Sequence, residues 1–311
     1  MKLIIPVSTH DQHLIPNFYK AMEAFPISRE HDLLIIGGRE NEVAIKSLEE
    51  GMKHLFSSTE TKLFEDTMLG WPGSCNYYFQ QTCHYLASIG NNKPFFWFEL
   101  DTTPTQSGWL DIICKKYFED TTNAALEGRK AKVYFGALER NYEGKNGELL
   151  PQSIAGNRMA PIGIYSSDIT RIPVLSSLSA SNRHWSSIIQ WYTTPNLQDT
   201  KMIQNNWRTE KYRLEGNNIV CESIANLAWD VHFNNTIEPE CLIVHGCKDG
   251  SLLEVLLNKN NSTMKVATNI SLAEAKRMAE DFDESDEKDP ETARKDSKKF
   301  ALFKKKDNKE E

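Results

Sequence analysis

Glu99 and Asp101 are two carboxylates one residue apart, directly after the aromatic run FFWF. Residues at i and i+2 of a strand share a face, so at a strand end both side chains can reach one partner. Carboxylate oxygens are the ligands that Mg²⁺ and Mn²⁺ prefer, and phosphates bound to such a cation would lie beside them. The pair therefore predicts a divalent-cation site. The alternative is that Asp101 caps a turn at DTTP and Glu99 pairs with a nearby Lys or Arg.

A second group of chemically useful residues occurs late in the chain, in VHGCKDGSL at 244–252. His245 follows an apolar run and can supply a third metal ligand. Lys248 offers a compact cation that can neutralise a diphosphate. The glycines of this segment, Gly246 and Gly250, free the backbone around it. The alternative is a surface loop with an ordinary turn at KDG.

The segment GWPGSCN at 70–76 combines one proline and two glycines ahead of a helical pattern. We expect Ser74 to be the N-cap of that helix, and a helix N-terminus attracts anions. Asn76, in the first turn, is predicted to hydrogen-bond a sugar or phosphate oxygen. The alternative is a purely structural helix entry with Trp71 packed in the core.

Short apolar runs alternate with segments of helical spacing along the first half of the chain, which predicts an α/β fold. We expect a Rossmann-type, mainly parallel sheet flanked by helices, with a nucleotide-binding crevice at the carboxyl ends of its first four strands. The predicted strands are 2–8, 31–38, 61–66, 93–101, 131–139 and 160–166. The predicted helices are 13–25, 40–55 and 107–120, together with a long helix within 70–90 that follows a loop and the N-cap Ser74.

The pattern is weaker after the sixth predicted strand. We expect helices around 180–192 and 220–232, and then a strand, a loop and a short helix within 240–257. Thr102 to Pro104 are expected to turn the chain between the carboxylates and the helix that follows them.

Composition restricts the classes of protein. The chain has 311 residues and a formal net charge of -7, which argues against coating duplex nucleic acid by charge alone but leaves a local basic patch possible. Its six cysteines form no CxxC pair, which argues against a zinc site. No apolar run reaches the roughly 18 residues of a membrane span. We expect a cytoplasmic protein with reduced thiols and no membrane contact.

The acid-x-Asp strand end, the early β-α-β unit and the late H-G-x-K loop together resemble GT-A fold glycosyltransferases over about residues 1–257. The resemblance implies metal-dependent transfer of a sugar from a nucleotide-diphosphate sugar to an acceptor hydroxyl, with Mn²⁺ or Mg²⁺ as cofactor. A UDP-sugar is the first donor that it suggests. It implies that His245 binds the metal and Lys248 binds the diphosphate. The family's usual first acid is Asp, and here it is Glu99. Asp101 is therefore the main expected metal ligand, while Glu99 can serve the metal, the sugar or a supporting contact.

The resemblance also implies a base and ribose pocket at the ends of the first two strands, matched here by Pro6 and Ser8 and by Gly37 and Gly38. Together with a change in composition at about residue 271, it divides the chain into a GT-A-like domain and a charged tail. The domain spans 1–270, with a nucleotide-binding half at 1–120 and an acceptor half at 121–270, and the tail spans 271–311.

Three segments together, GWPGSCN, FELDTTPTQSGWL and HGCKDGSL, are similar to bacteriophage glycosyltransferases, some of which modify hydroxymethylated bases in DNA. That narrower resemblance implies DNA with modified bases as the acceptor and the host cytoplasm as the location. An inverting enzyme needs a carboxylate base near the acceptor hydroxyl. Asp230, beside Trp229, is the candidate base or sugar ligand, and Asp168 is a weaker one. The alternative for Asp230 is a solvated helix residue.

The tail contains an acidic block at 279–291 and a basic block at 293–311 around FALF. Its low hydrophobicity and dense charge predict a disordered segment or a lone helix that keeps the protein in solution. The other interpretation is a docking peptide at 293–311 that inserts its apolar residues into a protein partner such as a replication clamp.

Two other functions fit part of the pattern. A nucleotidyltransferase acting on sugar phosphates uses a related sheet and metal, but it should carry a Gly-rich basic loop after the first strand. The loop here is STHDQH, without Gly or Arg. A non-catalytic protein that binds a nucleotide sugar is the remaining alternative.

Overall fold

In the computed structural model the chain divides into two units, Met1–Leu257 and Asn258–Glu311. No helix among the described residues is both long and apolar enough to cross a membrane. The described residues are 1–66, 69–70, 72–129, 133–139, 158–181, 184–186, 188–189, 197–205, 211–216, 218–221, 224–226, 231–233 and 236–268.

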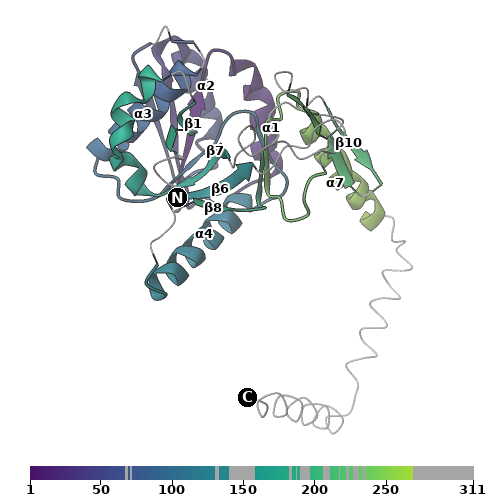
Figure 1. The fold of residues 1–311 in the computed structure, drawn as a ribbon. Coiled ribbons are helices and arrows are strands. Elements are labelled where there is room, and N and C mark those ends of the chain that lie inside the picture. Colours follow the sequence, from purple (N-terminus) through teal and green to yellow (C-terminus); the bar gives the residue numbers. More distant parts are fainter. Residues whose placement is uncertain are drawn as a thin grey trace, which may run out of the picture. The chain divides into compact units, whose positions relative to one another are not determined.

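A seven-stranded sheet with the order β3-β2-β1-β4-β7-β6-β8 forms the centre of the first unit (Figure 1). Its strands are β1 (Lys2–Val7), β2 (Asp32–Gly38), β3 (Ser58–Phe64), β4 (Phe95–Trp97), β6 (Tyr134–Glu139), β7 (Arg158–Tyr165) and β8 (Leu197–Asp199). β7 is antiparallel to both of its neighbours, and the other four adjacent pairs are parallel. The predicted α/β class with a mainly parallel sheet is confirmed.

Helices cover both faces of this sheet. α1 (Ile15–Ala24), α2 (Glu42–Met52) and α4 (Trp109–Leu126) share one hydrophobic cluster with one face of the strands. α3 (Gly73–Ser88) and the 3-10 segments η3 (Ser167–Arg171) and η4 (Pro173–Ala180) share a second cluster with the opposite face. Shorter 3-10 segments, η1 (Gln12–Leu14) and η2 (Arg39–Asn41), precede α1 and α2. Because both faces are covered, the central strands β1, β2 and β4 are largely apolar on both sides, whereas the edge strand β3 (STETKLF) is polar and half-buried.

The aromatic run FFWF fixes the strand that leads to the two carboxylates. Phe96 and Phe98 point to the face of α1 and α4, where the Phe98 ring stacks on Trp109 with centroids 4.8 Å apart. Phe95 and Trp97 point to the α3 face, where Trp97 meets Phe79 at 5.1 Å. Large rings buried on both faces leave this strand end little freedom to shift.

The chain turns earlier than expected after this strand. The backbone N–H of Thr102 donates to the carbonyl of Glu99 at 3.1 Å, so the turn spans Glu99 to Thr102. Thr102–Pro104, expected to turn the chain, instead form strand β5. The expectation was wrong because these residues find a distant partner, β14 (Ile243–His245), with which they pair antiparallel.

A three-stranded sheet with the order β5-β14-β9 therefore stands beside the carboxylates. β9 (Ile203–Asn205) pairs parallel with β14, so one rung of this sheet aligns Thr102, His245 and Asn205. Backbone hydrogen bonds thus join the segment that carries His245 to the segment that follows Glu99 and Asp101.

Other late elements also differ from expectation. The predicted helix at 220–232 is wrong, because the chain there forms the short strands β11 (Asn218–Cys221), β12 (Ile224–Asn226) and β13 (Val231–Phe233). β11 pairs with β10 (Tyr212–Glu215), and β12 pairs with β13, so local strand pairing outweighs helical spacing in this segment. The predicted final helix exists as α7 (Ser251–Thr268).

Ser74 is not the N-cap of α3. The helix begins at Gly73 with Pro72 as its N-cap, two residues earlier than predicted, and the Ser74 hydroxyl donates to the carbonyl of Leu69. Pro72 cannot donate a backbone hydrogen bond, which suits it to the position just before a helix, where N–H groups lack partners.

Phe98→Ala is expected to lower the free energy of unfolding by about 3–5 kcal/mol, because it removes a fully buried ring from its stack on Trp109. Urea unfolding followed by tryptophan fluorescence measures this. The matched control is Phe118→Ala, since Phe118 is 46% exposed and should cost less than about 1 kcal/mol. Equal losses in the two variants would contradict the anchoring role of FFWF.

Candidate functional site

Glu99, Asp101 and His245 converge at the carboxyl end of β4. Each offers one ligand atom, and these atoms all lie within 4.8 Å of one another. His245 Nε2 is 3.0 Å from Glu99 Oε2 and 3.1 Å from Asp101 Oδ1. Within the described part of the chain no other three His, Cys, Asp or Glu side chains converge in this way. The structure brings together the three residues predicted as metal ligands.

The way in which the two carboxylates meet differs from the predicted strand alternation. Both lie in the turn between β4 and β5 rather than on one face of a straight strand. The backbone N–H groups of Gly246 and Cys247 donate to the carbonyl of Asp101 at 3.0 and 2.7 Å. Gly246 has φ 92, a left-handed conformation that favours glycine. The turn and the His245 loop are therefore held as one piece.

Charge in this cluster is concentrated and poorly exposed. Asp101 is 8% exposed and His245 is 9% exposed. Burial opposes a charge on His245, but Asp101 and Glu99 outweigh it and raise the pKa of His245 to about 10. Burial likewise opposes a charge on Asp101, while His245 and Lys248 lower the pKa of Asp101 to about 2. The two carboxylates therefore demand a positive partner.

Asn205 orients the imidazole. Its Oδ1 hydrogen-bonds to Nδ1 of His245, which places the proton on Nδ1 and directs Nε2 at the two carboxylates. A histidine that ligates a metal usually donates its other ring N–H in this way. The sequence did not point to Asn205, because only the pairing of β9 with β14 brings this residue to the site.

Glu99 is held from two sides. Trp97 Nε1 donates to its Oε1 at 3.2 Å, and its Oε2 faces His245. The longer side chain of Glu99, in place of the expected Asp, thus still reaches the cluster.

Lys248 adds a second positive charge beside the cluster. Its Nζ lies 3.5 Å from Asp101 Oδ2 and 3.9 Å from Asp11 Oδ1. Burial opposes this charge, yet Asp101 and Asp11 together raise the pKa of Lys248. Asp11, in the loop after β1, is a member of the site that the sequence analysis did not single out.

The donor set fits a divalent cation. Two carboxylates and one imidazole present oxygen and nitrogen atoms to a common point, and such ligands suit Mn²⁺ or Mg²⁺. The Nε2 atom of His245 faces one oxygen of Glu99 and one of Asp101, so either a proton or a cation must lie between Nε2 and these oxygens. Metal ligation by these residues stays a prediction that their geometry supports.

The ends of β1 and β2, predicted as a base and ribose pocket, lie side by side. Pro6 pairs with Ile36, and Val7 pairs with Gly37. A Cβ on Gly37 would lie 2.6 Å from the carbonyl oxygen of Val7, so only glycine fits this close approach.

Polar side chains gather around these strand ends. A Cβ on Gly38 would meet the Glu40 carboxylate and the Tyr78 hydroxyl, which hydrogen-bond each other at 3.0 Å. The buried Asn41 accepts from Thr9 Oγ1 at 3.0 Å and from Gln12 Nε2 at 2.6 Å. Nucleotide binding by Pro6, Ser8, Gly37 and Gly38 stays a prediction.

Asn76 is fully buried, and its amide nitrogen donates to the carbonyl of Leu178 at 3.1 Å. This contact ties α3 to η4 and favours the structural alternative over the predicted sugar contact.

Asp168 lies in η3, with its backbone N–H donating to Ser166 Oγ at 3.3 Å, and it is not part of the cluster. Asp230, Trp71 and the tail 271–311 lie outside the described residues.

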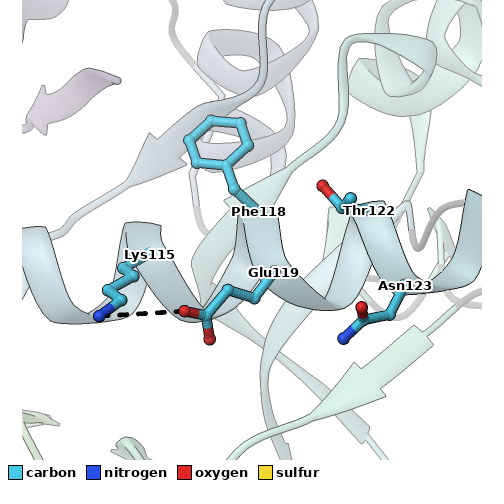
Figure 2. A pocket seen from close by; sticks show the side chains of 5 residues that line it. All are labelled: Lys115, Phe118, Glu119, Thr122 and Asn123. Carbon is cyan, nitrogen blue, oxygen red and sulfur yellow. Dashed lines mark ion pairs between the residues drawn. The ribbon is translucent and has the colours of Figure 1, made fainter.

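A surface pocket of about 430 Å³ lies on α4 (Figure 2). Figure 2 shows Phe118 standing on the helix opposite the ion pair between Lys115 and Glu119, which are 4.0 Å apart. The residues that line it are Lys115, Phe118, Glu119, Thr122 and Asn123. None of them belongs to the carboxylate–histidine cluster, so this pocket is separate from the candidate site.

Comparisons with known proteins find similarity among solved structures. No family model and no curated protein matches the chain. Mouse xyloside xylosyltransferase 1 matches 67% of this chain and 87% of its own at 10% identity, with a TM-score of 0.41. The galactosyltransferase LgtC, solved with donor and acceptor sugar analogs, matches 66% of this chain and 76% of its own at 8% identity and a TM-score of 0.44. The glycosyltransferase GlyE of Streptococcus pneumoniae matches 65% of this chain and 46% of its own at 7% identity and a TM-score of 0.41.

His245 is expected to remain protonated well above neutral pH in the metal-free protein, because Asp101 and Glu99 raise its pKa to about 10. An NMR titration with a chelator present measures this, with the resonance assigned by its loss in His245→Gln. Asp101→Asn should move the midpoint downward. A midpoint near the ordinary 6.5 in the unaltered protein would contradict the described charge pairing.

The same pairing sets how stability should change with pH. The His245 contribution is complete below pH 6.5 and is lost as the pH rises through about 10. The Asp101 contribution is complete above 3.8 and is lost as the pH falls through about 2. Both are present between these limits. The difference in unfolding free energy between the unaltered protein and Asp101→Asn should therefore shrink as the pH rises above 6.5.

Proposed function

We propose that this protein is a metal-dependent glycosyltransferase that moves a sugar from a nucleotide-diphosphate sugar to an acceptor hydroxyl. The observation that supports this best is the convergence of Glu99, Asp101 and His245, with Lys248 on the other side of Asp101. Two positive partners on one buried carboxylate form a site that suits a cation and a diphosphate together.

The position of the site in the fold supports a nucleotide donor. The parallel strands β1, β2 and β4 all end toward this region, and ligands of open α/β sheets bind at the carboxyl ends of their strands. Asn41 and Glu40 offer polar groups there for a ribose or a base. A UDP-sugar is the donor we propose to test first.

In the proposed reaction, the bond between the sugar carbon and the diphosphate oxygen breaks, and a bond to the acceptor oxygen forms. Negative charge develops on the leaving diphosphate, and Lys248 would stabilise it. A cation held by Asp101, Glu99 and His245 would supply further charge stabilisation. The acceptor hydroxyl must lose its proton to a base, and Asp230 remains our candidate for that role.

For the acceptor we propose a hydroxymethylated base in DNA, on the likeness of GWPGSCN, FELDTTPTQSGWL and HGCKDGSL to bacteriophage enzymes. The basic segment 293–311 would then bring the enzyme to its DNA through a protein partner such as a replication clamp. Transfer of a labelled sugar to DNA with and without hydroxymethylated bases, beside free sugars and peptides, distinguishes this acceptor from the others.

Asp101→Asn is expected to lower donor hydrolysis and sugar transfer by at least about 100-fold, because it removes the charge that faces both His245 and Lys248. The measurement is release of nucleoside diphosphate from a panel of nucleotide sugars with Mn²⁺ or Mg²⁺. Asp120→Asn, which alters an Asp–Lys pair on α4, is the matched control and should retain activity.

Chelation should abolish the same activity, and added Mn²⁺ should restore it. If turnover of every donor survives both Asp101→Asn and chelation, the metal-dependent mechanism is wrong. If the donor raises the thermal midpoint only with Mn²⁺ but no turnover occurs with any acceptor, the protein binds nucleotide sugars without catalysis.

A further inference from the structure

The Lys248 ammonium lies between two carboxylates that come from distant parts of the chain. Asp101 Oδ2 is 3.5 Å away and Asp11 Oδ1 is 3.9 Å away. The Lys248 side chain is 58% exposed, so packing restrains this long and flexible chain only in part. Its position therefore depends largely on these two negative charges.

Asp11 is itself firmly placed. Its Oδ2 accepts a hydrogen bond from Ser8 Oγ at 2.7 Å, which leaves Oδ1 for Lys248. Its backbone N–H donates to the carbonyl of Ser8 at 3.1 Å, and its own carbonyl accepts from the N–H of Leu14 at 2.9 Å. The loop between β1 and α1 thus presents this carboxylate in a fixed direction.

The two carboxylates differ in what else they serve. Asp101 also faces His245 at 3.1 Å and is one of the three residues of the candidate cation site. A cation held there shares the Asp101 charge, so the attraction between Asp101 and Lys248 weakens. Asp11 lies outside the set of three and keeps its full charge for Lys248.

We propose that Asp11 is a positioning residue that holds Lys248 beside the diphosphate when the cation site is filled. The inference rests on the function proposed above. Simple repulsion between Asp11 and the diphosphate would make binding tighter when the Asp11 charge is removed. The proposal predicts the opposite, weaker binding, because the Asp11 charge acts by holding Lys248 in place.

Isothermal titration calorimetry with Mn²⁺ and the diphosphates of uridine, guanosine, adenosine and cytidine tests this, using the one that the unaltered protein binds most tightly. Asp11→Asn should weaken its binding by about three- to fivefold, the upper range for an exposed ion pair. In a Lys248→Ala background the same change should have less than about a twofold effect. Asp11→Glu should restore most of the affinity, and the control Asp120→Asn should bind as the unaltered protein does.

Mn²⁺ alone should bind Asp11→Asn and the unaltered protein with the same affinity. Thermal unfolding checks that each variant is folded, and Asp11→Ser replaces Asp11→Asn if the latter does not fold.

Three results would overturn the inference while leaving the proposed function intact. An equal loss in the Lys248→Ala background would mean that Asp11 contacts the nucleotide directly. Tighter nucleotide binding by Asp11→Asn would mean that repulsion dominates. A loss of Mn²⁺ affinity would make Asp11 a cation ligand. If the unaltered protein binds no nucleoside diphosphate with Mn²⁺, the proposed function fails and the inference fails with it.

Discussion

The charge on Asp101 is the constraint to which the rest of the site responds. A carboxylate that is 8% exposed can stay ionised only if positive groups replace the water it has lost, and the structure supplies His245 on one oxygen and Lys248 on the other. Each of these partners needs support of its own. Asn205 orients His245, and Asp11 faces Lys248, so one buried charge organises residues from three other segments of the chain.

The backbone brings those segments together. The FFWF strand is fixed by rings on both faces of the large sheet, and the turn that follows passes directly into β5. β5 pairs with β14, and β14 pairs with β9, so the histidine and its asparagine partner arrive on adjacent strands at matching positions. A site assembled by strand pairing keeps its side chains within tenths of an ångström more readily than one assembled from loops.

The sequence predicted the parts of this arrangement that depend on local pattern. Alternating apolar strands and helices gave the α/β class, and the polar residues after FFWF and before HGCK pointed to Glu99, Asp101, His245 and Lys248. Asn205 and Asp11 were missed, because each reaches the site only through a long-range contact that no spacing reveals. The strand at Thr102–Pro104 was missed for the same reason. The helix predicted around 220–232 failed because short paired strands obtain their stability from each other rather than from periodicity.

The parallel pairing of β9 with β14 has a consequence for how such a protein can diversify. Two parallel neighbours need a connection that leaves one end of the pair and returns to the other, and here residues 206–242 make that excursion. Both ends of the excursion are fixed by the rung that aligns Asn205 with His245. Within it, Tyr212 is 2% exposed, and its backbone N–H donates to Ser251 Oγ, just after the loop that carries His245 and Lys248. Evolution can therefore vary the excursion only where these contacts to the loop behind the charged centre are kept.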